Sequence, residues 1–120
     1  MNLVTAFTND YSQLIDLTLE DGSIVNMSLT YVASQQGWFY SITYGSFSVL
    51  GMRLITGLNL LRKYRNIIPF GIRVDTSDGY EPVNINDFSS GRITFNLLSA
   101  LDVQLTETYI TQTLPISLGI

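Results

Sequence analysis

Short apolar runs separated by turn residues fill most of this chain, and they limit its fold more than any other feature of the sequence. The first two runs are joined by Glu20-Asp21-Gly22-Ser23. Asp-Gly between two apolar runs is a strong β-hairpin signal, because glycine accepts the positive φ angle of a primed turn. Further runs begin at Trp38 and Phe47, each after a break of polar and glycine residues. Strands that recur about every eight to ten residues predict an antiparallel meander.

The middle of the chain departs from this pattern. Leu58, Leu61 and Tyr64 recur every third residue with basic residues between them, which favours a short helix near residues 57–66. Pro69 keeps that helix short. Strand character returns over residues 70–76 and 92–98. We therefore expect an all-β protein, a small antiparallel β-barrel or sandwich with at most one short helix.

The segment after residue 101 is expected to be separate from this core. Its apolar residues Val103, Leu105, Tyr109 and Ile110 are interleaved with polar ones, as in a strand with one apolar face. We therefore divide the chain into a core domain over residues 1–101 and an extended C-terminal arm over residues 102–120. The arm is suited to pairing with the sheet edge of a neighbouring protein, and one more strand of the chain's own sheet is an equal alternative.

The chain contains no histidine and no cysteine. Histidine is the usual proton shuttle near neutral pH, and it shares with cysteine most of the ligation of zinc. Serine triads, cysteine dyads and ordinary zinc sites are therefore excluded. Only carboxylate chemistry or the binding of a hard cation remains, so we expect a protein that is not an enzyme and has no cofactor.

The stretch Asp75-Thr76-Ser77-Asp78-Gly79-Tyr80-Glu81 is the one constellation that resembles a chemical site. Its three carboxylates would suit Ca²⁺, but they do not follow the alternate spacing of an EF-hand loop. Asp-Gly loops are far more often turns in which the Asp side chain bonds its own backbone. A glycosidase pair would need a second acidic cluster, which the sequence does not offer. We predict a turn without a metal.

Charged residues are scarce and unevenly distributed. They make up 13% of the chain, about half the usual share, while hydrophobic residues reach 46%. A subunit packed into an assembly needs less surface charge than a soluble monomer, so this composition favours an assembly over a surface rich in Thr, Ser and Asn. The net charge of −4 argues against nucleic-acid binding, and no apolar run has the roughly 18 residues of a membrane span.

The basic residues suggest one surface for a partner. Residues 1–52 carry four acidic residues and no basic one, whereas every basic residue lies between 53 and 92. Arg53, Arg62, Lys63 and Arg65 would form a patch for an acidic surface, including the acidic N-terminal region of another copy. A solvated face of the predicted short helix is the alternative.

The aromatic residues suggest a second surface. Trp38, Phe39 and Tyr40 are consecutive, so at least one of them must point away from the core of a strand. Trp38 and Tyr40 are our candidates for an exposed interface anchor, and core packing on both faces is an equal alternative.

Several of these segments together resemble a known family. They are Trp38-Phe39-Tyr40, Gly51-Met52-Arg53-Leu54, Gly57-Leu58-Asn59-Leu60-Leu61, Gly71-Ile72, Asp78-Gly79, Pro82, Asn86-Asp87-Phe88 and the apolar strand from Arg92 to Leu98. In order and spacing this set is similar to the cyanophage-type baseplate plug proteins of contractile-tailed phages. The extension after about residue 100 departs from the pattern.

The resemblance implies a structural subunit of the virion tail baseplate, assembled in the host cytoplasm. Its expected partners are other tail proteins, namely hub, spike, tube or sheath-initiating subunits, in a symmetric assembly of several copies. The alternative is a small β-barrel module that binds a carbohydrate or peptide on Trp38, Tyr40 and Tyr44 as a stacking platform. A carboxylate enzyme ranks third.

Overall fold

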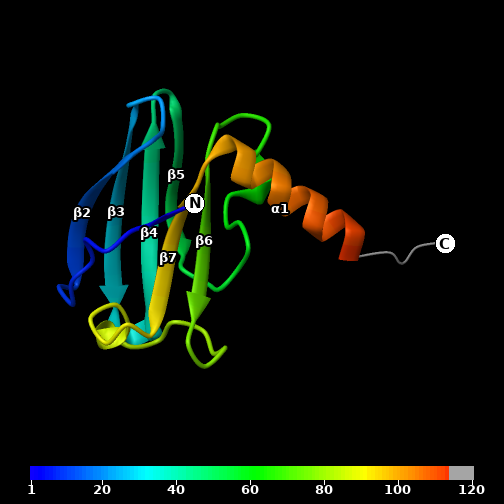
Figure 1. The fold of residues 1–120 in the computed structure, drawn as a ribbon. Helices are drawn as coiled ribbons and strands as arrows, with labels where there is room; N and C mark the ends of the chain where they lie inside the picture. The colour runs from blue at the N-terminus through cyan, green and yellow to red at the C-terminus, as the bar shows by residue number, and fades with distance from the viewer. Residues whose placement is uncertain (114–120) are drawn as a thin grey trace.

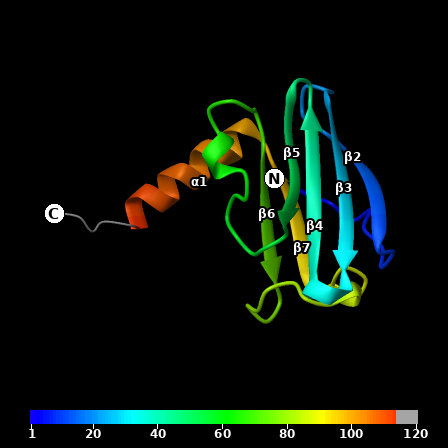
Figure 2. The same ribbon diagram turned by 180° about the vertical axis from the view of Figure 1, so that it is seen from behind.

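The computed structural model describes residues 1–113, which form two facing antiparallel sheets and one α-helix that leaves their side (Figure 1, and from behind in Figure 2). The strands are β1 (Asn2–Leu3), β2 (Ser12–Thr18), β3 (Ile24–Val32), β4 (Gly37–Tyr44), β5 (Phe47–Arg53), β6 (Gly71–Thr76) and β7 (Ile93–Leu98). The helix is α1 (Ala100–Thr113), and three short 3-10 turns are η1 (Ala33–Gln35), η2 (Arg62–Tyr64) and η3 (Ile85–Asp87).

The strands pair in the orders β2-β3-β4-β5 and β1-β7-β6. The predicted hairpin is present, with Gly22 at φ 87° between β2 and β3 and the Asp21 carboxylate accepting a hydrogen bond from the Ser23 amide at 2.9 Å. Within residues 1–113, β5 and β6 do not pair, so the fold is a sandwich and not a closed barrel. The predicted all-β class is confirmed.

Alternating side chains from the two sheets make the core. The outer residues of β2 are exposed and the inner ones buried along its whole length, which is the signature of a strand with one face in water. Trp38, Phe70 and Phe95 are the largest fully buried side chains. The other buried residues that line the core include Ile15, Leu17, Val25, Met27, Leu29, Tyr40, Ile42, Leu54, Leu61, Ile72, Val74 and Leu97.

The prediction of a short helix near residues 57–66 is wrong, except that residues 62–64 form the 3-10 turn η2. Gly57 forms a β-bridge with Val74, and the Leu60 amide donates to the Ile72 carbonyl at 2.8 Å. Asn59 adds to this pairing, because its side-chain oxygen accepts from the Ile72 amide at 3.2 Å. Residues 57–60 are therefore held along the edge of β6, and a helical turn forms only after them, at η2.

The prediction of an extended arm over residues 102–120 is also wrong for the part that the structure describes, because residues 102–113 belong to α1. Ser99 and Asp102 form a reciprocal N-cap, each side chain accepting from the other's amide at 3.1 Å. Val103, one turn after Ser99, is buried against the sandwich. The cap and the buried residue favour a helix over the alternating strand pattern. Residues 114–120 lie outside the described part of the chain.

Candidate interaction surfaces

Trp38 and Tyr40 lie in the core and not on the surface. Trp38 is 0% exposed, and its indole nitrogen donates to the Asn84 carbonyl at 3.1 Å. Burial raises the pKa of Tyr40 to about 12. Tyr44 packs edge-on against Phe70, so the three rings of the stacking platform do not form a binding face.

Phe39 is the outward-facing aromatic of this run. It is half-buried, and the guanidinium of Arg53 lies 5.5 Å from the centre of its ring. Arg53 also donates to the carbonyls of Gln35 and Gln36, at 3.2 and 3.0 Å. Arg53 therefore belongs to the end of β5 that lies beside η1.

The other three basic candidates are grouped on and beside η2. Arg62 and Arg65 contact the carboxylate of Glu107 in α1, at 2.7 and 3.3 Å. The hydrogen bond from Arg62, together with the charges of both arginines, lowers the pKa of Glu107. Lys63 lies over the ring of Tyr64 at 5.1 Å. The structure thus brings together three of the four predicted residues and leaves Arg53 apart.

Helix α1 is attached to the sandwich along one face. Val103 is buried, Ile110 is half-buried, and Glu107 joins the helix to η2. The hydrogen bond from the N-terminal amino group, followed by that from the Ser99 amide, lowers the pKa of Asp102 at the start of the helix. Most of these contacts lie in the first two turns of the helix.

The opposite side of α1 carries an exposed apolar row. Leu101, Leu105 and Tyr109 are 62%, 59% and 59% exposed and stand four residues apart, so they follow one another along the helix surface. Leu105 and Tyr109 also line a groove of about 480 Å³ between the helix and the three-stranded sheet. The groove is completed by Met1, Leu58, Arg73, Leu98, Asp102 and Thr106. Of the predicted arm residues, Leu105 and Tyr109 are exposed and Val103 is not.

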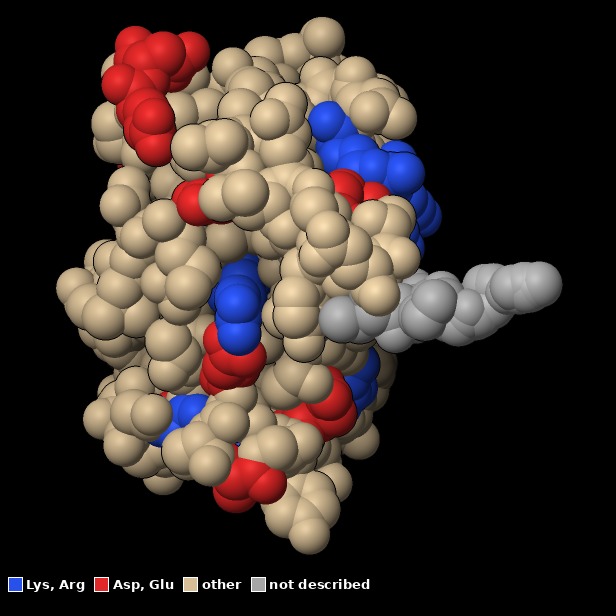
Figure 3. Space-filling view, turned by 45° about the vertical axis from the view of Figure 1, so that its right-hand side comes forward, with Lys and Arg blue, Asp and Glu red and all other residues tan. Residues whose placement is uncertain are grey.

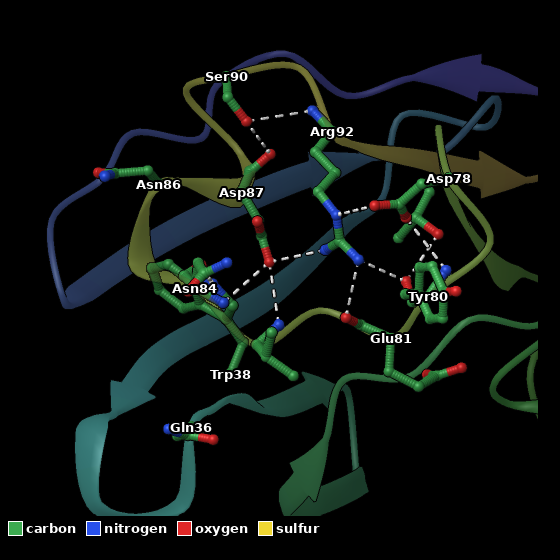
Figure 4. A network of polar contacts seen from close by, with 12 residues as sticks. Gln36, Trp38, Asp78, Tyr80, Glu81, Asn84, Asn86, Asp87, Ser90 and Arg92 are labelled. Carbon is green, nitrogen blue, oxygen red and sulfur yellow. Dashed lines mark hydrogen bonds and ion pairs between the residues drawn. The ribbon is translucent and has the colours of Figure 1, made fainter.

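Arg92 organises the most connected polar cluster, which was not predicted from the sequence (Figure 4). Its guanidinium lies 3.0 Å from the carboxylate of Asp78 and 2.9 Å from that of Asp87. It also donates to the carbonyls of Tyr80 and Glu81, at 2.8 and 3.1 Å. The hydrogen bond from Arg92, ahead of that from the Tyr80 amide, lowers the pKa of Asp78. One side chain therefore fixes the whole loop before β7.

The carboxylates of the Asp75–Glu81 stretch point to separate partners. Asp75 pairs with Arg73 at 2.9 Å, Asp78 pairs with Arg92, and Glu81 accepts from the Thr56 amide at 2.7 Å. In residues 1–113 no group of three or more acidic side chains is arranged to hold a metal ion. The Asp78 carboxylate accepts from the Tyr80 amide at 3.0 Å, which is the backbone bond expected of an Asp-Gly turn.

Charged side chains cover a minority of the face in Figure 3, which shows an acidic group at the upper left, a basic group at the upper right, a basic group directly above an acidic one near the centre, and further charged groups in the lower half. No helix within the described residues has the length and hydropathy to cross a membrane. Most of this face is therefore formed by uncharged residues.

Comparison with models of known protein families gives a match. A family model described as cyanophage baseplate Pam3 plug gp18 matches residues 3–100. The match covers β2 to β7 and ends where α1 begins. No curated protein matches the chain.

Proposed function

Because the chain belongs to the cyanophage baseplate plug family, we propose that it binds neighbouring proteins in the baseplate of a contractile phage tail. Membership makes it a structural component of the tail. The family match over residues 3–100 is the observation that carries the proposal, since it covers both sheets of the sandwich. The proposed neighbours are hub, spike, tube or sheath-initiating subunits, joined during assembly in the host cytoplasm.

The surface supports a role in assembly. Leu14, Leu50, Ile67 and Tyr80 are each at least 70% exposed, and they add to the apolar row on α1. Charged residues make up 13% of the chain. Protein interfaces are depleted of charged residues at their centre and enriched in aromatic ones, which fits this surface.

The polar clusters support a structural role as well. Arg92 and its carboxylates hold a loop, and the acidic groups of Asp75–Glu81 are each bound by a neighbour. Of the rings that would form a carbohydrate-binding platform, Trp38 and Tyr40 are buried, and the half-buried Tyr44 packs edge-on against Phe70. These arrangements favour binding of proteins over turnover of a substrate.

Complementation of a phage that lacks this gene product tests the proposal. Without the protein, we expect electron micrographs to show few complete baseplates, and we expect the wild-type chain supplied in trans to restore them. Mass spectrometry of purified tails should then detect the protein. A phage that assembles normal, infectious tails without it would contradict the proposal, as would its absence from purified tails.

A further inference from the structure

We propose that copies of this chain bind one another through the two edges of the four-stranded sheet, with the β2 edge of one copy against the β5 edge of the next. The inference deepens the proposed function, on which it rests, by naming a second copy as one of the partners. It is based on the free edges of the sheet, on the direction of its strands and on the distribution of charge along them.

Both edges are available for pairing. In the sheet order β2-β3-β4-β5, neither β2 nor β5 pairs with a further strand among residues 1–113. The unpaired backbone groups of an edge strand are a template for a strand of another chain. Each edge also carries an apolar side chain in water, Leu14 at 88% and Leu50 at 75% exposed.

The strand directions favour copies that share one orientation. The four strands are antiparallel to their neighbours, so β2 and β5 at the two ends run in opposite directions. A second copy placed beside the first without inversion therefore presents its β2 antiparallel to the first copy's β5. Such a contact uses two different surfaces, and it closes into a ring when the rotation between copies divides a full turn.

The charges of the two edges are opposite. Asp10, Asp16, Glu20 and Asp21 lie before, on and after β2, and no basic side chain occurs in residues 1–52. The first end of β5 lies beside η2, because Phe47 packs against Tyr64 with ring centres 5.1 Å apart. The basic side chains there, Arg62, Lys63 and Arg65, outnumber Glu107, which pairs with both arginines, so this end keeps a net positive charge. One acidic and one basic edge complement each other when copies meet side by side.

The strand register places these charges at matching heights. Asp16 pairs with Asn26, Asn26 with Thr43, and Thr43 with Ser48, so the acidic end of β2 is level with the start of β5 beside η2. At the other end, one row joins Ser12 of β2 to Arg53 of β5 through Thr30 and Phe39. Asp10 precedes Ser12 by two residues, so it lies near the level of Arg53.

A bulge in β5 limits the length of the contact. The register of β4 and β5 shifts between Tyr40 and Ile42, and Gly51 opposite this shift has φ 63°. A bulge bends its strand and interrupts pairing. Regular pairing is therefore restricted to the first part of β5, residues 47–50, and the charges beside it select the partner.

The test uses charge exchange on the isolated full chain. Glu20→Lys makes the β2 edge less acidic, and Lys63→Glu makes the β5 edge less basic. In sedimentation velocity at low salt, we expect the wild type to associate with rising concentration and each variant to associate about tenfold more weakly. An equal mixture of the two variants should regain the wild-type association, because each exchanged edge then meets its opposite charge.

Asp75→Lys is the matched control, because it makes the same change of charge on β6 in the other sheet. It should associate like the wild type, and melting temperatures should show that all variants are folded. A wild type that stays monomeric overturns the inference, and so do variants that associate normally or a mixture that does not recover. Those results would not affect the proposed binding to other tail proteins, which the complementation test examines separately. The failure of this inference and the failure of the proposed function are therefore distinguishable.

Discussion

The guanidinium of Arg92 lies 2.9 Å from the carboxylate of Asp87, a side chain that is only 4% exposed. The same carboxylate accepts from the amides of Val83 and Asn84, both at 2.9 Å. Asp87 is thus a charged group placed inside the loop before β7, and Arg92 is the group that neutralises it.

Replacement of Arg92 should therefore destabilise the protein markedly. We expect Arg92→Met to lower the free energy of unfolding by about 2–3 kcal/mol, because a buried carboxylate is left without its cation. Urea unfolding measures the change. Arg73→Met is the control: the side chains of the Arg73–Asp75 pair are 36% and 48% exposed, so a loss of about 0–1 kcal/mol is expected. Equal losses in the two variants would contradict a special role for Arg92.

Helix α1 should depend on its N-cap. We expect Ser99→Ala to cost about 1 kcal/mol, because the Asp102 amide loses its acceptor. Hydrogen exchange should be faster in the first turns of α1 and unchanged in β3 and β4. Ser89→Ala, at an exposed loop position, should leave exchange in α1 as it is in the wild type. Unaltered exchange in α1 of Ser99→Ala would count against the cap.

The ion pair between Arg62 and Glu107 should make the free energy of unfolding depend on pH in the acidic range. The pKa of Glu107 lies below its ordinary value of 4.5 in the folded chain. Its stabilising effect is therefore complete above that value and is lost as the pH falls through the lowered pKa. In urea unfolding, we expect Glu107→Gln to be less stable than the wild type at pH 7. The difference between their free energies of unfolding should be smaller near pH 3. A difference that is constant over this range would argue against the ion pair.

Gly71 should tolerate no side chain. A Cβ added there would lie 2.6 Å from the side-chain oxygen of Asn59, which is held by the amides of Leu61 and Ile72. We expect Gly71→Ala to lower the free energy of unfolding by about 1–3 kcal/mol, measured by urea unfolding.

Gly37→Ala is the matched control for this substitution. The atoms nearest to its Cβ would be those of the Arg53 guanidinium, the end of a long side chain that can move away. The free energy of unfolding should therefore fall clearly less than for Gly71→Ala. If the free energy of unfolding fell more for Gly37→Ala than for Gly71→Ala, Asn59 would be able to move aside for a side chain at position 71.

Most strands were predictable because their apolar runs are bounded by turn residues, whereas the two-residue strand β1 was not predicted. The hairpin around Asp21-Gly22 is an example, since its backbone geometry needs a glycine at one position. Helix α1 was missed because Val103 and Leu105 alternate with polar residues as in a strand. The signal that marks it is local: Ser99 and Asp102 have the spacing of a capping box.

The candidate surfaces were predictable only in part. Arg62, Lys63 and Arg65 are close in sequence, so their grouping required no knowledge of the fold. The burial of Trp38 and Tyr40, in contrast, depends on which face of β4 meets the other sheet. The Arg92 cluster joins residues from two sides of a loop, and nothing local in the sequence pairs Arg92 with Asp78.

The connection between β7 and α1 has a mechanical consequence. Ser99 alone separates the helix from β7, the central strand of the three-stranded sheet. The hydrogen bonds of an antiparallel ladder lie across the strands, so tension along β7 loads many of them at once in shear. A partner that pulls on α1 would therefore pull against the β6–β7 ladder as a unit, and this mode of loading resists rupture better than peeling one bond at a time.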